Sequence, residues 1–88
     1  MSIKRNNLFG TIEFVSNKEK EIKEIKKAID RVGIIVGFLN YYKNGDIIAK
    51  DRYGNFLGVY IDKDYRTYDI YNNEYCHGNG LMDIIYNQ

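Results

Sequence analysis

Cys76 and His77 form the only thiol–imidazole pair in the sequence, which contains one Cys and one His. A catalytic dyad needs the imidazole within hydrogen-bond reach of the thiol and a third group that orients it. If the two residues share a strand, their side chains point to opposite faces. One Cys also allows no internal disulfide and implies no oxidising compartment. The pair therefore favours a small buried thiol beside a turn histidine over a nucleophile and its base.

A metal site would have to combine Cys76 and His77 with the carboxylates of Asp69, Glu74 and Asp83. No two of these residues have a recognised ligand spacing, and there is no second Cys or second His. The glycines form neither a phosphate-binding loop nor a dinucleotide fingerprint. We therefore predict a non-enzymatic protein with no metal and no cofactor.

Tyrosines and carboxylates gather in the second half of the chain. All nine tyrosines lie between Tyr41 and Tyr86, and residues 46–88 carry seven acidic against four basic side chains. So small a core cannot bury nine phenols with their hydroxyls satisfied, so several are expected at the surface. Exposed Tyr is enriched at binding interfaces, although it could also serve as strand filler here. The predicted binding face is acidic and aromatic, and comprises Asp46, Asp51, Tyr53, Asp62, Asp64, Tyr65, Tyr68, Asp69 and Tyr71.

One amphipathic helix is predicted over residues 17–32. Ser16 and Glu19 fit a capping box, and Gly33 fits a left-handed helix stop. The apolar stripe that this helix would turn toward the core consists of Ile22, Ile25, Ile29 and Val32.

A basic ridge would follow the opposite side of that helix. It lies in the more basic half of the chain, since residues 1–45 carry nine basic and five acidic side chains. It is formed by Lys20, Lys23, Lys27 and Arg31. Such a ridge could contact phosphates of a nucleic acid, or it could be a solvated helix face. It is the alternative to the acidic and aromatic face.

The remaining elements are expected to be short strands. Leu8–Val15 alternates apolar and polar residues ahead of the helix. Further strands are predicted at residues 34–42, 46–50, 56–61, 66–71, 74–77 and 81–86, separated by turns rich in Asn, Asp and Gly. Connections this short require antiparallel pairing.

These elements predict an α+β fold in a single domain covering residues 1–88. The order is β-α-β followed by a β-meander, with one amphipathic helix packed on a curved antiparallel sheet or a small barrel of about six strands. The predicted core consists of Ile22, Ile25, Ile29, Val32, Ile35, Phe38, Leu57, Val59 and Ile61.

The second half also contains a weak internal repeat of strand, turn and strand. Asp51-Arg52-Tyr53-Gly54-Asn55 aligns with Asp69-Ile70-Tyr71-Asn72-Asn73 at an offset of 18 residues. Residues 45–86, about half of the chain, resemble the Asp-x-Tyr-Gly-Asn hairpin repeats of small bacterial β-flower-type proteins. That resemblance implies a hairpin architecture and no catalytic residues.

Composition narrows the class of protein. The net charge of +1 does not indicate a strongly basic nucleic-acid binder. The longest uncharged run is too short to span a bilayer, and the first residues lack the apolar core of a signal peptide, so a cytoplasmic protein is expected. Ile, Asn, Lys and Tyr have AT-rich codons and are abundant, while Pro is absent, which indicates a low-GC bacterium or its phage.

Three functions follow from these features. The first is a small binding protein, most concretely a phage or mobile-element inhibitor of the anti-CRISPR or anti-defence type, which occupies a host protein or nucleoprotein through the acidic and aromatic face. The second is direct nucleic-acid binding through the basic ridge. The third is a homo-oligomer that sequesters a small nucleotide-like ligand in a Tyr-lined pocket between subunits.

Overall fold

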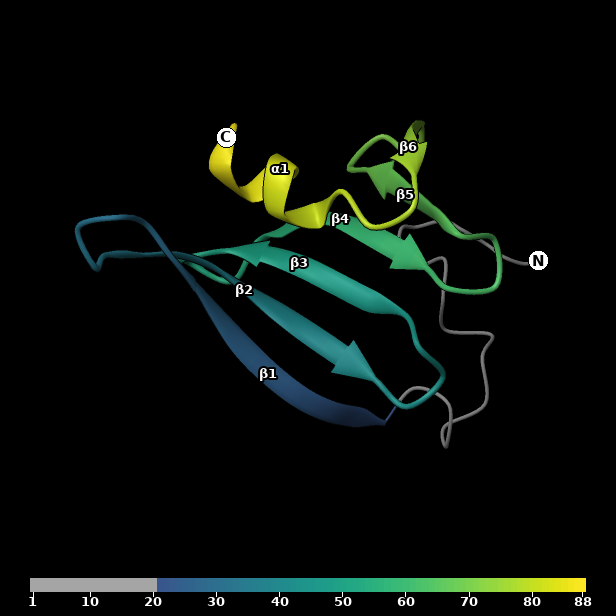
Figure 1. Cartoon of the computed structure of the whole chain (residues 1–88), viewed down its shortest axis with the longest axis horizontal. Coiled ribbons are helices and arrows are strands. Elements are labelled where there is room, and N and C mark those ends of the chain that lie inside the picture. Colours follow the sequence, from purple (N-terminus) through teal and green to yellow (C-terminus); the bar gives the residue numbers. More distant parts are fainter. Residues whose placement is uncertain (1–20) are drawn as a thin grey trace.

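A computed structural model describes residues 21–88, which form one six-stranded antiparallel sheet and one short helix (Figure 1). The elements are β1 (Ile22–Ile29), β2 (Ile35–Tyr42), β3 (Ile47–Asp51), β4 (Phe56–Ile61), β5 (Arg66–Asp69), β6 (Glu74–His77) and α1 (Leu81–Tyr86). The strands lie side by side in chain order, so every pair of neighbours is a hairpin. The architecture is broadly α+β, with an open sheet edged by β1 and β6.

The five strands β2 to β6 confirm the predicted antiparallel meander. The turn residues mark the strand ends, because Asn, Asp and Gly readily adopt the backbone angles that a tight hairpin needs. The residues that take a positive φ in the five hairpin turns are Gly33, Gly45, Gly54, Tyr65 and Asn72.

The predicted helix over residues 17–32 is wrong where the structure describes it, because residues 22–29 form β1 instead. Local helix propensity yields here to backbone pairing with β2 along its length. Gly33 does adopt the left-handed conformation, with φ of 89°, but it closes a hairpin rather than a helix. The predicted strand Leu8–Val15, the start of the helix and Lys20 lie outside the described residues.

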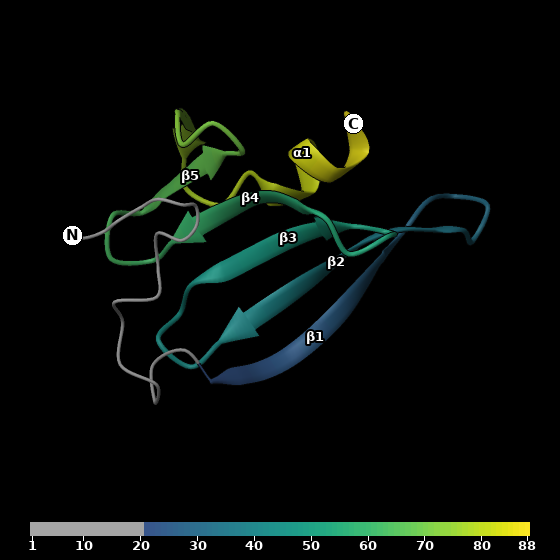
Figure 2. The same cartoon turned by 180° about the vertical axis from the view of Figure 1, so that it is seen from behind.

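The predicted last strand over residues 81–86 is also wrong, because this segment is α1. Leu81 and Ile85 are spaced one helical turn apart and are 0% and 1% exposed, so the helix buries one apolar side. α1 packs on β2, β3 and β4 (Figures 1 and 2). Gly37 and Gly58 let it approach, since a Cβ on either would stand 3.2 Å from Ile85 and 3.1 Å from Ile84, respectively.

The buried core therefore lies between α1 and the sheet. Its members are Ala28, Leu39, Ile47, Ala49, Tyr60, Leu81 and Ile85. Of the predicted core, Val59 is buried and Leu57 packs against the cluster from a half-buried position. Four predicted members are wrong because β1 is an edge strand followed by a turn: Ile22, Ile25, Ile29 and Val32 are all exposed. Ile35, Phe38 and Ile61 are half-buried.

Candidate functional site

The predicted acidic and aromatic face separates into two groups at opposite ends of the sheet. Successive turns of a meander alternate between the two ends of its strands. The β2–β3 and β4–β5 turns therefore share one end, which we call the acidic end and define by Asp46, Asp62, Asp64, Tyr60, Tyr65 and Tyr68. The β3–β4 and β5–β6 turns carry Asp51, Tyr53, Asp69 and Tyr71 at the other end. The nine predicted residues do not form one continuous face.

Asp51 and Asp69 hold their turns together. The Oδ1 atom of Asp51 accepts hydrogen bonds from the backbone N–H groups of Tyr53 at 2.9 Å and Asn55 at 2.8 Å. The Oδ1 atom of Asp69 accepts the equivalent two hydrogen bonds, from the backbone N–H groups of Tyr71 and Asn73. These bonds, led by the one from Asn55, lower the pKa of Asp51. Both carboxylates are structural, because turn amides occupy their acceptor positions.

Asp30 forms the same bonds in the β1–β2 turn, from Val32 at 3.0 Å and Ile34 at 2.9 Å. The segment Asp30–Ile34 is thus a third copy of the turn whose repeat the sequence shows at residues 51–55 and 69–73. The sequence Asp-Arg-x-Gly occurs at both residue 30 and residue 51, and this match is the signal that could have revealed β1.

The acidic end is tied together across two turns. Asp46 Oδ1 accepts a hydrogen bond from the Asp62 backbone N–H at 2.9 Å, and Asn44 Nδ2 donates to Asp46 Oδ2 at 3.1 Å. Desolvation by burial raises the pKa of Asp46. Gly45 makes this approach possible, because a Cβ there would stand 2.7 Å from an oxygen of Asp62. Two hairpin turns separated in sequence therefore present their carboxylates side by side.

Two tyrosine hydroxyls donate hydrogen bonds to the carboxylates of Asp62 and Asp64 at the acidic end. The Tyr60 hydroxyl lies 3.2 Å from Asp62 Oδ1, and the Tyr68 hydroxyl lies 3.1 Å from Asp64 Oδ2. Desolvation first, and then donation to a carboxylate, raises the pKa of both tyrosines. Sequence reasoning missed Tyr60, although a strand places residues 60 and 62 on the same side.

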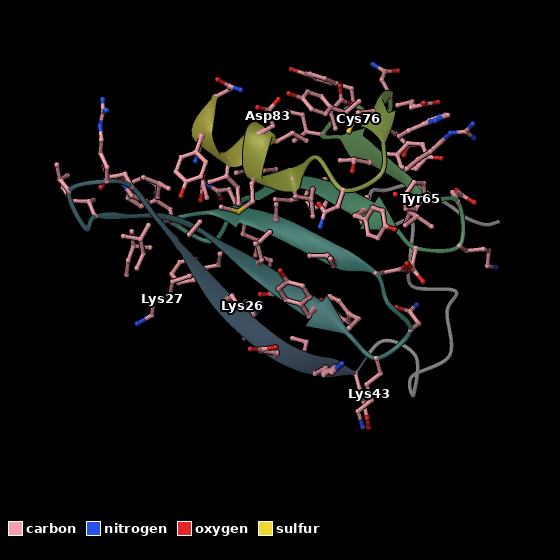
Figure 3. All side chains as sticks on the ribbon, viewed as in Figure 1. Lys26, Lys27, Lys43, Tyr65, Cys76 and Asp83 are labelled. Atoms are coloured by element: carbon pink, nitrogen blue, oxygen red, sulfur yellow. The ribbon has the colours of Figure 1, made fainter. Side chains whose placement is uncertain are left out.

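Tyr65 is the most unusual residue of the acidic end. Its φ is 55°, in the left-handed region, at the position that the other four hairpin turns fill with Gly or Asn. Its side chain is nevertheless 66% exposed, and its ring meets Tyr60 edge-on with centroids 6.3 Å apart. Figure 3 shows Tyr65 at the same end of the sheet as Lys43. A bulky side chain at a positive φ is strained, so the turn chemistry alone does not explain it.

The opposite end presents one large exposed side chain from each of its three turns. Val32, Tyr53 and Tyr71 occupy equivalent positions, each two residues after the turn aspartate. They are exposed to 74%, 75% and 76%, respectively. Arg52 lies over the Tyr53 ring at 5.1 Å and donates to its hydroxyl at 3.0 Å. None of the three has a positive φ, so these side chains occupy unstrained positions.

The basic ridge does not form, because its segment is a strand and not a helix. Lys26 lies over the ring of Tyr41 at 5.1 Å, and the next residue, Lys27, points to the opposite face of β1 (Figure 3). Lys23 occupies an irregularity in the register of β1, and Arg31 lies in the following turn. Charged residues on an edge strand instead discourage pairing with other chains.

Cys76 and His77 are arranged as a strand requires, on opposite faces. Cys76 pairs with the buried Thr67 and is half-buried, with Sγ 2.5 Å from where a Cβ of Gly80 would stand. His77 Nε2 lies 3.1 Å from Arg66 Nη2 and 3.6 Å from Glu74 Oε2. The two residues therefore do not form a dyad.

Within residues 21–88, no group of three or more His, Cys, Asp or Glu side chains could hold a metal ion. The same stretch contains no helix long and apolar enough to cross a membrane.

Comparison with known proteins gives no match to any family model, curated protein or solved structure. The resemblance to β-flower-type hairpin repeats therefore stays a prediction.

Proposed function

We propose that this chain is a small non-enzymatic binding protein whose binding surface is the acidic end. The observation that carries the proposal is Tyr65, a strained and exposed aromatic residue where four equivalent turns have Gly or Asn. Strain of this kind persists at binding sites, where the side chain contributes more than its backbone costs. Tyr is also among the residues that most often anchor a protein interface.

The partner that this surface fits is a basic one. Asp46, Asp62 and Asp64 place three carboxylates in the two turns that meet at this end, beside the basic residues Lys43, Lys63 and Arg66. Carboxylates fixed by hydrogen bonds attract a positively charged surface and orient it with little loss of entropy. A basic nucleic-acid-binding surface on a host protein or nucleoprotein has this chemistry.

The narrower form of the proposal is an inhibitor made by a phage or mobile element, of the anti-CRISPR or anti-defence type, acting in the cytoplasm. Its support is the amino-acid composition, which is rich in Ile, Asn, Lys and Tyr, the residues with AT-rich codons, and contains no Pro. The inhibitor would occupy the basic channel through which its host target binds nucleic acid. Direct nucleic-acid binding is not favoured, because the helix that would carry the basic ridge is a strand over residues 22–29. No observation of residues 21–88 favours a homo-oligomer that sequesters a small ligand.

The test begins with the immobilised full chain and lysate of a low-GC bacterium, and measures the affinity of any purified partner for three variants. Tyr65→Asn and Asp64→Lys are each expected to lower that affinity at least about tenfold. Tyr53→Asn removes an equally exposed tyrosine from the opposite end and is expected to leave the affinity unchanged. Binding should also weaken as salt rises. Equal affinity of wild type, Tyr65→Asn and Asp64→Lys would reject the proposal.

A further inference from the structure

Three of the five hairpin turns expose large side chains at the same two positions. The β1–β2, β3–β4 and β5–β6 turns share the end of the sheet opposite the acidic end. Their exposed residues, which we call the turn tips, follow each turn aspartate by one and two places: Arg31, Val32, Arg52, Tyr53, Ile70 and Tyr71. None of them belongs to the core cluster or has a positive φ, so neither core packing nor turn geometry accounts for the apolar ones.

The β2–β3 turn shows what the meander accepts at an exposed turn. It is polar throughout, with Lys43, Asn44 and Asp46 around Gly45. Polar residues are the usual choice in turns, because their side chains bond to the local backbone. The tip residues two places after each aspartate are instead aliphatic or aromatic, and they are 74%, 75% and 76% exposed. Their recurrence indicates a surface that contacts something apolar.

The carboxylates at this end are engaged within the fold. Asp30, Asp51 and Asp69 are half-buried, and the Oδ1 atom of each accepts hydrogen bonds from two backbone N–H groups of its own turn. Glu74, which follows the third of these turns, lies 3.5 Å from Arg66 Nε. The aspartates satisfy turn N–H groups that would otherwise lose their hydrogen bonds to water in an apolar layer. The tips therefore expose cations and apolar groups in front of the carboxylates.

The two arginines among the turn tips are exposed cations next to apolar groups. Arg31 adjoins Val32, and Arg52 adjoins Tyr53. The Arg52 guanidinium lies 5.1 Å from the centre of the Tyr53 ring and donates a hydrogen bond to its hydroxyl at 3.0 Å. A guanidinium carries further N–H groups, which pair well with phosphate oxygens. An aromatic ring with a polar hydroxyl beside such a cation suits the boundary between lipid headgroups and acyl chains.

We propose that the turn tips bind the surface of a membrane that contains anionic lipids. Arg31 and Arg52 pair with headgroup phosphates, while the tip tyrosines and aliphatic side chains enter the boundary layer. Neighbouring tips lie two strands apart, about 10 Å along the sheet. Separate convex tips at this spacing fit a deformable layer better than one preformed pocket. Val32 and Ile70 favour lipid over a single-stranded nucleic acid, because bases stack on aromatic rings and not on aliphatic side chains.

This contact lies on the membrane surface and does not cross it. The acidic end is at the other ends of the same strands, so it faces away from the membrane and stays open to a partner. The inference stands independently of the proposed function, since it uses no residue of the acidic end. Partner affinities are measured without vesicles, so Tyr53→Asn keeps its place as their control. A few side chains anchor a protein weakly, so membrane binding is expected to be reversible and to weaken as salt rises.

The test is co-sedimentation of the full 88-residue chain with two kinds of vesicle, phosphatidylcholine alone and phosphatidylcholine mixed with phosphatidylglycerol. Wild type is expected to bind the mixed vesicles at least about tenfold more strongly than the neutral ones. Tyr53→Ser combined with Tyr71→Ser should weaken binding to the mixed vesicles at least about fivefold. Arg31→Gln combined with Arg52→Gln should remove the preference for phosphatidylglycerol.

Two matched controls change the same kinds of side chain elsewhere. Met82→Ser removes a 41% exposed apolar side chain from α1. Lys43→Gln combined with Lys63→Gln removes two cations from turns at the acidic end and gives the same net charge as the arginine variant. Both controls should bind the mixed vesicles as wild type does, and circular dichroism checks that every variant is folded.

A Trp reporter locates the contact, because the chain contains no Trp of its own. Tyr53→Trp and Tyr71→Trp should each emit at shorter wavelength with the mixed vesicles and be shielded from acrylamide, whereas Tyr65→Trp should show neither change. Failure of wild type to bind the mixed vesicles would overturn the proposal, as would unchanged binding by the double tyrosine variant. Binding to a labelled single-stranded oligonucleotide that depends on the tips, without binding to vesicles, would overturn it in favour of nucleic acid.

Discussion

Replacing Tyr65 with Asn should separate the binding role of this residue from any structural one. Asn readily adopts the left-handed conformation, and Asn72 fills the equivalent position in the β5–β6 turn. Relief of the strained backbone is worth about 1–2 kcal/mol. Loss of the edge-on contact with Tyr60 costs about 0.5–1.5 kcal/mol, at the lower end because the Tyr65 ring is 66% exposed. Removing a large aromatic side chain should therefore leave the free energy of unfolding unchanged or raise it by about 1 kcal/mol.

The assay is urea denaturation followed by circular dichroism, with two comparison variants. Tyr53→Asn changes an equally exposed tyrosine with an ordinary φ, so it relieves no strain and gains no stability. Tyr60→Asn removes a ring that belongs to the core, so it should unfold at clearly lower urea concentration. A fall of more than about 1 kcal/mol in Tyr65→Asn would refute the reasoning, because it would show that Tyr65 holds the turn in place.

Three further outcomes follow from the fold. Gly58→Ala should lower the free energy of unfolding by about 1–3 kcal/mol, because the new Cβ would stand 2.8 Å from a backbone oxygen. Gly54→Ala has open space around the new Cβ and should lose only about 1 kcal/mol, from strain at its positive φ. Thermal melts of the two variants test the difference. Leu81→Ala should cost about 2–5 kcal/mol by denaturation, because Leu81 is fully buried. The pKa of Asp51 is lower in the folded protein than its ordinary value of 3.8, so its ionised carboxylate stabilises the fold above pH 3.8. That stability is lost as the pH falls through the pKa of the folded state. In urea titrations, the free energy of unfolding of Asp51→Asn should therefore fall less between neutral and acid pH than that of wild type.

The four hairpins from β2 to β6 could be predicted from the sequence because their determinants are local. Turn aspartates and alternating flanks mark them within about ten residues, and in three of the four a Gly or Asn suited to a positive φ completes the signal. The two copies of the repeat, at residues 51–55 and 69–73, form the same turn, in which a backbone N–H four residues on donates to the aspartate Oδ1.

The two elements that were predicted wrongly have ambiguous local signals. Ile22, Ile25 and Ile29 fit a helical stripe, and only pairing with β2, a tertiary effect, makes this segment a strand. Residues 81–86 contain adjacent β-branched residues typical of a strand, but Leu81 and Ile85 also fit one helical turn.

The candidate site was predicted in part. Its residue types were identified, but the prediction placed both ends of a meander on one face. Asp51 and Asp69 belong to odd-numbered turns of the meander, and Asp46 and Asp62 to even-numbered ones, so their separation follows from the strand order alone. The backbone conformation of Tyr65 could not be predicted, because it depends on the length of its turn and not on its residue type.

The most direct test of the binding role is the ratio of partner affinities between Tyr65→Asn and Tyr53→Asn, measured by isothermal calorimetry on folded protein. The two variants remove the same side chain from exposed turns at opposite ends of the sheet. We expect Tyr65→Asn to bind at least about tenfold more weakly than Tyr53→Asn, while being no less stable. Equal affinities, or a loss confined to Tyr53→Asn, would contradict a binding surface at the acidic end.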